Sequence, residues 1–175
     1  SKLQLARESG ADLVAMSSDL ADAAGTFSDG HGVDAVIITA STKDNGPIEV
    51  AGEIARKKGR VVVVGAVGMN VPREPYYQKE LDLCLPMSYG PGRYDAAYEE
   101  HGHDYPFGYV RWTEQRNMQA FLELVATGKV RLKPLITHRF PIEQAESAYA
   151  LMMEGSTPYI AMVITYPTDR ARPLP

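Results

Sequence analysis

The sequence has little cysteine, no long apolar run and no strong net charge. Its 175 residues include one cysteine, Cys84, which excludes an internal disulfide. That cysteine stands in the apolar run ELDLCLPM, so a buried structural thiol is expected. No stretch of about 18 apolar residues and no secretory signal is found, so neither a membrane span nor export is predicted. A net charge of −4 gives no general attraction to nucleic acid or membrane, and we expect a cytoplasmic protein.

The stretch from Gly32 to Gly68 predicts a βαβ unit. Two short runs rich in β-branched residues, Ala35–Ile38 and Val61–Val64, lack polar alternation, which is typical of strands buried on both faces of a parallel sheet. Between them a helix is expected, with Pro47 near its start, lysines and Gly59 at its end, and an apolar face made of Ile48, Ala51, Ile54 and Ala55. Ligands of such sheets bind at the carboxyl ends of the strands.

The rest of the chain alternates helix and strand patterns. Strands are predicted at Asp12–Met16, Leu81–Met87, Leu135–Phe140 and Tyr159–Tyr166. Helices are predicted at Ser1–Ser9, around Leu20–Phe27, at Thr113–Thr127 with Thr113 as N-cap, and from Pro141 to Gly155. We expect one partial domain over residues 1–166, interrupted by a turn-rich insertion at 88–111, and a proline-containing tail or linker at 167–175.

Five segments, taken in order, resemble the later part of a medium-chain dehydrogenase/reductase, of the zinc-type alcohol dehydrogenase superfamily. KLQLARESGAD resembles the helix after the second strand of that family's nucleotide-binding domain. GVDAVIITAS, GRVVVVGAVG and KELDLCLPMSYG resemble its fourth, fifth and sixth strands, and ITHRFPIEQAESAYALMMEG its closing segment. The resemblance implies an oxidoreductase that moves a hydride between a nicotinamide ring, of NAD or NADP, and an alcohol or carbonyl carbon.

A narrower resemblance rests on the segment YGPGRYDAAYEEHGHDYPFGYVRWTEQRNM. It is similar to a two-part oxidoreductase type in which a medium-chain unit is fused to a glucose–fructose-oxidoreductase-like unit. That likeness implies a small-molecule substrate of the sugar class.

Measured against the family, the sequence lacks the G-x-G-x-x-G turn, the acidic residue that would end strand two before Ser1, and the zinc ligands. The fold class expected is therefore α/β, a truncated Rossmann-type parallel sheet without its first βαβ unit. Backbone N–H groups of that missing turn grip the pyrophosphate, so this chain alone should bind a dinucleotide poorly. We expect Asp12–Met16 either to pair with Ala35–Ile38 or to leave the sheet. The alternative function is a non-catalytic assembly or dimerisation module.

By resemblance, three loops and one lysine line the cofactor. Thr39, Ala40 and Ser41 would lie on its ribose side, Gly65, Ala66 and Val67 beside the nicotinamide, and Ser88, Tyr89 and Gly90 would close the pocket, with Lys2 at the adenosine ribose. The alternative is that these are ordinary turns after strands and a solvated lysine. Catalytic residues are not identified by any spacing, and the complete enzyme could carry zinc.

The insertion offers a candidate substrate site. Its tyrosines and arginines, with Tyr105, Tyr109 and Arg111 as the chosen residues, suit recognition of a sugar or an anionic group. The alternative is an Ω-loop whose tyrosines pack against the domain. His101, His103 and Asp104 have alternate spacing but no further ligands, so no metal site is predicted.

The strand at 81–87 is expected to form a homodimer contact. Leu81, Leu83, Leu85 and Met87 alternate with Asp82, Cys84 and Pro86, which gives the strand two distinct faces. In the resembled family this sheet edge often joins its twin. Neither nucleic acid nor membrane is an expected partner.

Overall fold

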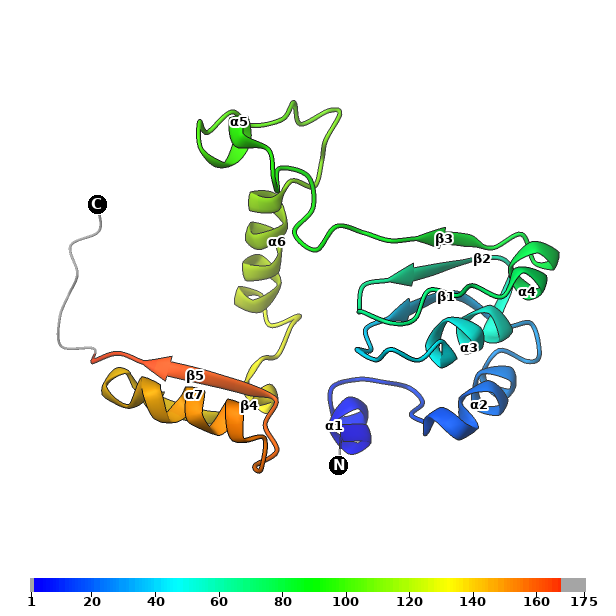
Figure 1. Ribbon diagram of the computed structural model, residues 1–175, viewed down its shortest axis with the longest axis horizontal. Helices are drawn as coiled ribbons and strands as arrows, with labels where there is room; N and C mark the ends of the chain where they lie inside the picture. Colours follow the sequence, from blue (N-terminus) through cyan, green and yellow to red (C-terminus); the bar gives the residue numbers. More distant parts are fainter. Residues whose placement is uncertain (1, 168–175) are drawn as a thin grey trace. The chain divides into compact units, whose positions relative to one another are not determined.

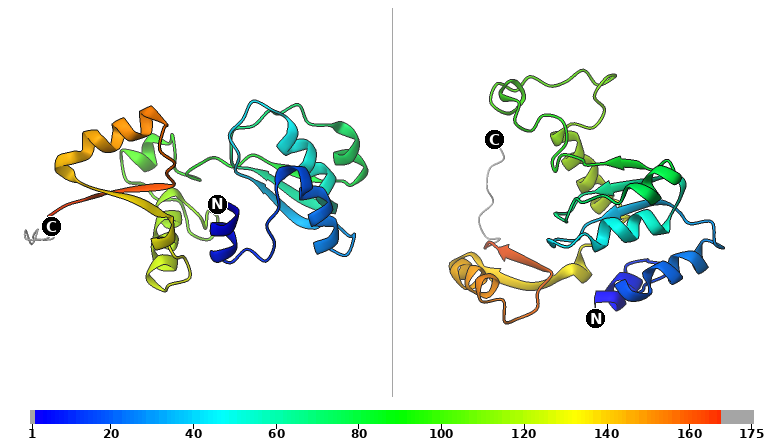
Figure 2. Two further views of the ribbon diagram at one scale, coloured as in Figure 1. Left: turned by 90° about the horizontal axis from the view of Figure 1, so that it is seen from below. Right: turned by 45° about the vertical axis from the view of Figure 1, so that its right-hand side comes forward.

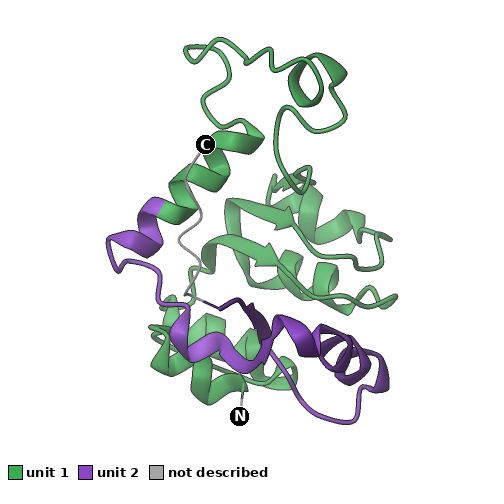
Figure 3. Cartoon of the chain, turned by 90° about the vertical axis from the view of Figure 1, so that its left-hand side faces the viewer, with its two compact units in different colours: residues 1–122 green, residues 123–175 purple. Residues whose placement is uncertain are grey.

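The computed structural model describes residues 2–167, and the chain divides into two compact units, residues 1–122 and 123–175 (Figure 3). Ser1 and most of the expected tail at 167–175 lie outside the described residues. The model confirms the expected α/β class with parallel strands. No helix among residues 2–167 is both long enough and apolar enough to cross a bilayer.

The first unit is built around a three-stranded parallel sheet (Figure 1). Its strands are β1 (Val33–Ile38), β2 (Ala55–Val63) and β3 (Asp82–Cys84), in the order β1-β2-β3. Helix α3 (Gly46–Ile54) connects β1 to β2 and packs on both, so the predicted βαβ unit is confirmed. The remaining elements of this unit are α1 (Lys2–Glu8), η1 (Ser17–Asp19), α2 (Leu20–Phe27), α4 (Arg73–Gln78), α5 (Ala96–Glu99) and the first turns of α6 (Glu114–Ala126).

The core of the first unit lies between the sheet and α3. Ile38, Val61 and Val63 point from the strands toward Ile48 and Ala51 of the helix, and all five side chains are buried. α2 and α4 pack against α3 (Figure 2). The expectation that the runs are buried on both faces is wrong, because Ile37 and Val64 are 65% and 56% exposed. Alternating strand residues face opposite sides of a sheet, and α3 covers one side.

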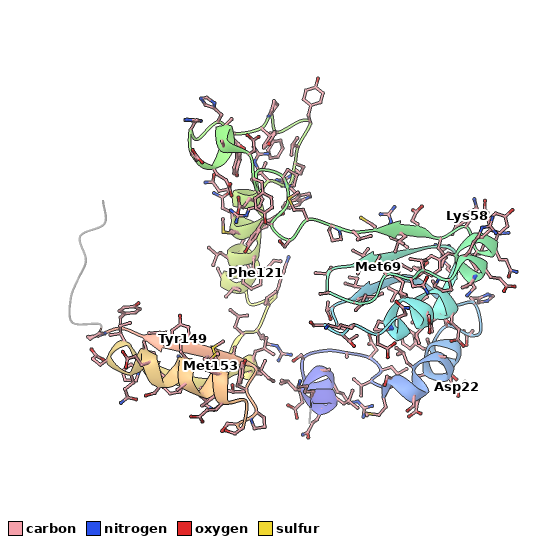
Figure 4. The ribbon with its side chains drawn as sticks, viewed as in Figure 1. Asp22, Lys58, Met69, Phe121, Tyr149 and Met153 are labelled. Carbon is pink, nitrogen blue, oxygen red and sulfur yellow. The ribbon has the colours of Figure 1, made fainter. Side chains whose placement is uncertain are left out.

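Helix α3 ends sooner than the sequence predicts. Ala55, expected on its apolar face, opens β2 instead, and the lysines expected at the helix end belong to the strand. Val33 pairs with Ala55 but Ala35 pairs with Arg60, so residues 56–59 bulge opposite residue 34. Lys58 (Figure 4) takes a left-handed φ of 59° in that bulge. Its backbone N–H donates to the carbonyl of Lys79 at 2.6 Å, which fixes the bulge against the end of α4.

The strand predicted at Asp12–Met16 is wrong, because those residues form no strand. The segment leaves the sheet, which was one of its two expected outcomes, and Leu13 and Met16 stay exposed.

Two further expectations concern β3 and are corrected. The strand expected at Leu81–Met87 is reduced to Asp82–Cys84, since pairing with β2 ends at Cys84. Cys84 itself is exposed rather than buried, because β3 is an edge strand of this sheet.

The second unit is a smaller βαβ arrangement. β4 (Ile136–Pro141) and β5 (Ala161–Thr165) pair in parallel, and α7 (Ala145–Glu154) connects them after the short helix η3 (Ile142–Gln144). A further short helix, η2 (Lys133–Leu135), precedes β4. The predicted stop of α7 at Gly155 is confirmed, since Gly155 caps the helix with a left-handed φ of 63°.

Helix α6 matches its predicted span to within one residue at each end. Thr113 was expected to cap it with its hydroxyl. Instead the Thr113 side chain is fully buried, and its Oγ1 finds no hydrogen-bond partner among residues 2–167. Its carbonyl accepts the N–H of Asn117 at 2.8 Å. The hydroxyl therefore does not act as the expected N-cap.

Candidate functional site

The loops that follow β1 and β2 lie side by side and are hydrogen-bonded to each other. The N–H groups of Val64 and Gly65 donate to the carbonyl of Ile38 at 2.9 and 2.8 Å, and the N–H of Thr42 donates to the carbonyl of Ala66 at 2.8 Å. Ser41 and Ala66 form an isolated parallel bridge. The structure thus brings together two of the three predicted cofactor loops, Thr39–Ser41 and Gly65–Val67.

Gly65 is required by this close approach. A Cβ built on Gly65 would collide with the backbone of Ala40 and would lie 2.8 Å from the carbonyl carbon of Thr39. Only a residue without a side chain permits two loop backbones at this distance. The small residues at the carboxyl end of the sheet therefore serve loop-to-loop packing.

The amino end of α3 is already occupied by a carboxylate of the chain. Asp44 Oδ1 accepts the N–H of Gly46 at 2.8 Å, and Asn45 Oδ1 accepts the N–H of Asn70 at 3.1 Å. Helix amino ends attract anions through free N–H groups and the helix dipole. Because Asp44 supplies that negative charge, this helix start is not suited to hold a pyrophosphate.

A hollow of about 530 Å³ follows the open edge of β1. Val36, Ile37 and Ile38 all line it, and consecutive strand residues point to opposite faces, so the hollow wraps around the strand edge. The other walls are mainly apolar and come from η1, α2 and α3: Ser17, Leu20, Pro47, Val50, Ala51 and Ile54. Thr39 and Ala40 stand at its rim. The hollow therefore combines an unpaired strand edge, an apolar wall and a predicted cofactor loop.

The third predicted loop belongs to another hollow. Ser88 and Tyr89 line a space of about 390 Å³ together with Met118, Phe121 (Figure 4) and Leu122 of α6. Asn117 Nδ2 donates to the carbonyl of Tyr89 at 3.2 Å, and Gly90 lies against the same amide group. Ser88–Gly90 thus contacts α6. Lys2, the fourth predicted cofactor element, lies on helix α1, which has no buried residue.

The insertion at 88–111 is held by its own polar network. Arg116 of α6 pairs with Asp104 and also donates to the carbonyls of Val110, at 2.5 Å, and Tyr105, at 2.9 Å. The Tyr105 hydroxyl donates to Asp95, and its ring stacks on Tyr98 with centroids 5.6 Å apart. Tyr105 is therefore tied into the insertion by both its ring and its hydroxyl.

These contacts shift three ionisation equilibria. The hydrogen bond from Tyr105 lowers the pKa of Asp95, and the same bond raises the pKa of Tyr105. The pKa of Arg93 is raised by its hydrogen bond to Glu99, whose Oε1 lies 2.5 Å from Nη1. Each shift favours the hydrogen-bonded form that the network already contains.

The other two predicted substrate residues are more accessible. Tyr109 is 92% exposed, and Arg111 is exposed with its guanidinium carbon 4.5 Å from the Phe107 ring centroid and 4.3 Å from that of Trp112. The insertion therefore holds one of the predicted substrate residues inside its network and presents two on its surface.

A metal centre has no ligand set in the part of the chain that is described. Nowhere in residues 2–167 do three side chains of the His, Cys, Asp or Glu type come together around a common point. Asp104, one of the three ligands considered from the sequence, is committed to Arg116 and to the N–H of Tyr105. Zinc chemistry therefore cannot be assigned to these residues.

Sequence reasoning missed two residues that hold helix α3 in place. Tyr76 of α4 is buried, donates its hydroxyl to the carbonyl of Ile48 at 2.8 Å and packs against Gly52. Burial raises the pKa of Tyr76 to about 12. Lys79 Nζ donates to the carbonyls of Gly52, Glu53 and Ala55 at 3.0, 2.6 and 3.0 Å. No local pattern marks either residue, because the partners stand more than 20 positions earlier in the chain.

This parallel α/β sheet, with close-packed loops at its carboxyl edge, is the architecture of a nucleotide-binding domain. The model of the zinc-binding dehydrogenase family matches residues 9–158, and the chain belongs to that family. A curated relative, D-arabitol-phosphate dehydrogenase of Enterococcus avium, is 23% identical over 160 residues, which are 89% of this chain and 38% of the relative.

Solved structures agree on the fold. AibC is 24% identical with a TM-score of 0.67, over 95% of this chain and 42% of AibC. The alcohol dehydrogenase TADH from Thermus sp. ATN1 is 17% identical with a TM-score of 0.68, over 95% of this chain and 41% of that enzyme. The chain thus spans about two fifths of the length of the relatives that it matches.

Proposed function

We propose that this chain is the carboxyl-terminal part of the nucleotide-binding domain of an NAD- or NADP-dependent oxidoreductase that interconverts an alcohol and a carbonyl compound. The observation that carries the proposal is the strand order β1-β2-β3 with an open edge at β1 and joined loops at the carboxyl end. In the doubly wound order 3-2-1-4-5-6, these strands correspond to 4, 5 and 6, and strand 1 would pair with β1. The apolar hollow along that edge has the walls that such a strand needs.

The residues of this chain would position the cofactor, and the nicotinamide ring would supply the hydride chemistry. Thr39–Ser41 and Gly65–Val67 would form the rim against which the ring and its ribose lie. Their mutual hydrogen bonds hold the rim rigid before any ligand arrives, which reduces the entropy lost on binding. The pyrophosphate would be gripped by a G-x-G-x-x-G turn encoded upstream, within about 45 residues before Ser1.

A sugar or sugar alcohol is the proposed substrate class. It is supported by the likeness of the insertion to the two-part oxidoreductase type, and by the name of the Enterococcus avium relative, which acts on a phosphorylated sugar alcohol. Fusion to a glucose–fructose-oxidoreductase-like unit and a cytoplasmic location belong to this proposal as well. The exposed Tyr109 and Arg111 would face such a substrate.

Calorimetric titration tests the cofactor proposal. Oxidised and reduced NAD and NADP are added to this chain and to a longer chain that begins one strand and one glycine-rich turn upstream. We expect measurable binding by the longer chain and a loss of at least about 100-fold in this one, because phosphate contacts are missing. Equal tight binding by both chains would contradict the proposal. Binding by neither would favour the alternative, a non-catalytic assembly module.

We further propose that two copies join through residues 81–87. Leu83, Leu85 and Met87 are exposed along the edge strand β3 and the segment after it, where water contacts a row of apolar side chains. Sedimentation equilibrium should give a dimer that Leu85→Asp converts to monomer. Leu13→Asp, the same change at another exposed leucine, is the control. A wild-type monomer at all concentrations would exclude this contact.

A further inference from the structure

Two arginines lie in the insertion, Arg93 and Arg111, and a third, Arg116 of α6, contacts it. The three differ in the hydrogen-bond acceptors that their guanidinium groups bind. Arg93 pairs with Glu99, and Arg116 pairs with Asp104 and two backbone carbonyls. Arg111 makes no hydrogen bond or ion pair with the described residues; its guanidinium lies over the rings of Phe107 and Trp112. The N–H donors of Arg111 are therefore available to a ligand.

The rings of Phe107 and Trp112 orient the Arg111 guanidinium so that its N–H groups can bind an oxyanion. Aromatic faces hold a guanidinium by its plane, through cation–π attraction and stacking, and leave the N–H groups at the edge of the plane. Those N–H groups form a flat fork that matches two oxygens of a phosphate or carboxylate. Because the plane is already oriented, binding costs less side-chain entropy than it would for a free arginine.

The carboxylates of the insertion itself are largely engaged. Asp95 accepts hydrogen bonds from Tyr105 and from the N–H of Ala97, Glu99 binds Arg93, and Asp104 binds Arg116. Glu100, at the end of α5, is the remaining carboxylate of segment 88–111. Three of the four carboxylates within the insertion are thus paired with donors of their own.

We propose that Arg111, oriented by Phe107 and Trp112, binds the phosphate monoester of a phosphorylated sugar or sugar alcohol. The inference rests on the proposed function, because it assigns the anionic end of the substrate to a residue of the insertion. A phosphate monoester carries close to two negative charges at neutral pH, so it gains more from an exposed guanidinium than a carboxylate does. The bond between Arg111 and the ligand is reversible and involves no chemical step.

The test is a titration of the full chain with D-arabitol phosphate, D-arabitol and inorganic phosphate at one fixed ionic strength, monitored by calorimetry or by amide chemical shifts. We expect D-arabitol phosphate to bind, D-arabitol to bind at least about tenfold more weakly, and Arg111→Gln to abolish that difference. Arg111→Lys keeps the charge but loses the fork, so it should restore only part of the affinity.

Arg73→Gln is the matched control. Arg73 also lies over a ring, with its guanidinium carbon 4.3 Å from the centroid of Tyr77, but it belongs to α4. The Arg73→Gln substitution should leave the binding of D-arabitol phosphate unchanged. If Arg73→Gln weakens binding as much as Arg111→Gln, or if D-arabitol phosphate binds no better than D-arabitol, the inference is overturned. Amide spectra of the variants confirm that each remains folded.

The outcome is independent of the cofactor test. If the wild-type chain shows no preference for the phosphate, or if the preference survives Arg111→Gln, while the longer chain binds the dinucleotide, this inference is refuted and the proposed function stands. A phosphate preference that depends on Arg111, without dinucleotide binding by the longer chain, would refute the proposed cofactor role and leave the assignment of Arg111 as a phosphate-binding residue standing.

Discussion

Replacement of Gly52 by alanine should destabilise the first unit although it improves the helix. A Cβ built on Gly52 lies 2.6 Å from Tyr76 Cε2, 3.1 Å from Tyr76 Cδ2 and 3.4 Å from Pro75 Cγ. Ordinary carbon contacts begin at about 3.5 Å. Overpacking of this kind costs about 1–3 kcal/mol, and alanine recovers up to about 1 kcal/mol of helix propensity. We therefore expect Gly52→Ala to lower the free energy of unfolding by up to about 2 kcal/mol.

Gly25 provides a control inside the same unit. It lies in α2 and has no positive φ, and no atom of the described residues comes within 4 Å of a Cβ built there. Gly25→Ala should therefore stabilise by about 0.5–1 kcal/mol. Urea denaturation followed by far-ultraviolet circular dichroism measures both variants against the wild type. If Gly52→Ala proves as stable as Gly25→Ala, the close packing of Tyr76 on α3 does not exist and the account of the core is wrong.

Three further predictions concern the side chains that hold α3 and the insertion. Burial raises the pKa of Tyr76 from 10.0 to about 12, so the folded state favours the neutral phenol. The contribution of Tyr76 to the free energy of unfolding is therefore complete below pH 10 and declines as the pH rises from 10 to 12. Tyr76→Phe should remove that decline from a plot of stability against pH. Lys79→Met removes three donors from carbonyls at the end of α3 and should cost about 1–3 kcal/mol in urea denaturation, whereas Lys57→Met should change little. Arg116→Gln should open the insertion, so that limited proteolysis cuts within 88–111 faster than in the wild type; an unchanged cleavage rate would show that this network does not hold the segment.

The βαβ unit could be predicted from sequence because its information is local. The β-branched runs, Pro47 before the helix and the glycine-rich loop after the second run each point to one structure. Ala55 was misassigned because it continues the helical spacing of Ile48, Ala51 and Ile54. What ends α3 is Lys79, which binds carbonyls of residues 52, 53 and 55 from a distant part of the chain.

The other corrections have the same origin in contacts that are distant in sequence. Asp12–Met16 has strand-like composition, but a strand needs a partner, and none of the described residues pairs with it. Cys84 lies in an apolar run, yet its burial depends on what covers β3 rather than on its neighbours in sequence. The joined loops could be placed at one edge from strand order alone, whereas the commitment of Tyr105 to Asp95 could not be read from spacing.

Amide hydrogen exchange at β1 tests most directly whether this sheet is part of a nucleotide-binding sheet whose next strand pairs with β1. In a parallel sheet, alternate N–H groups of a strand point to opposite neighbours. We predict that in this chain the β1 amides directed away from β2 exchange rapidly, and that they become protected in a chain extended upstream by one strand and its glycine-rich turn. Protection of those amides already in this chain, or no gain in the extended one, would contradict the account.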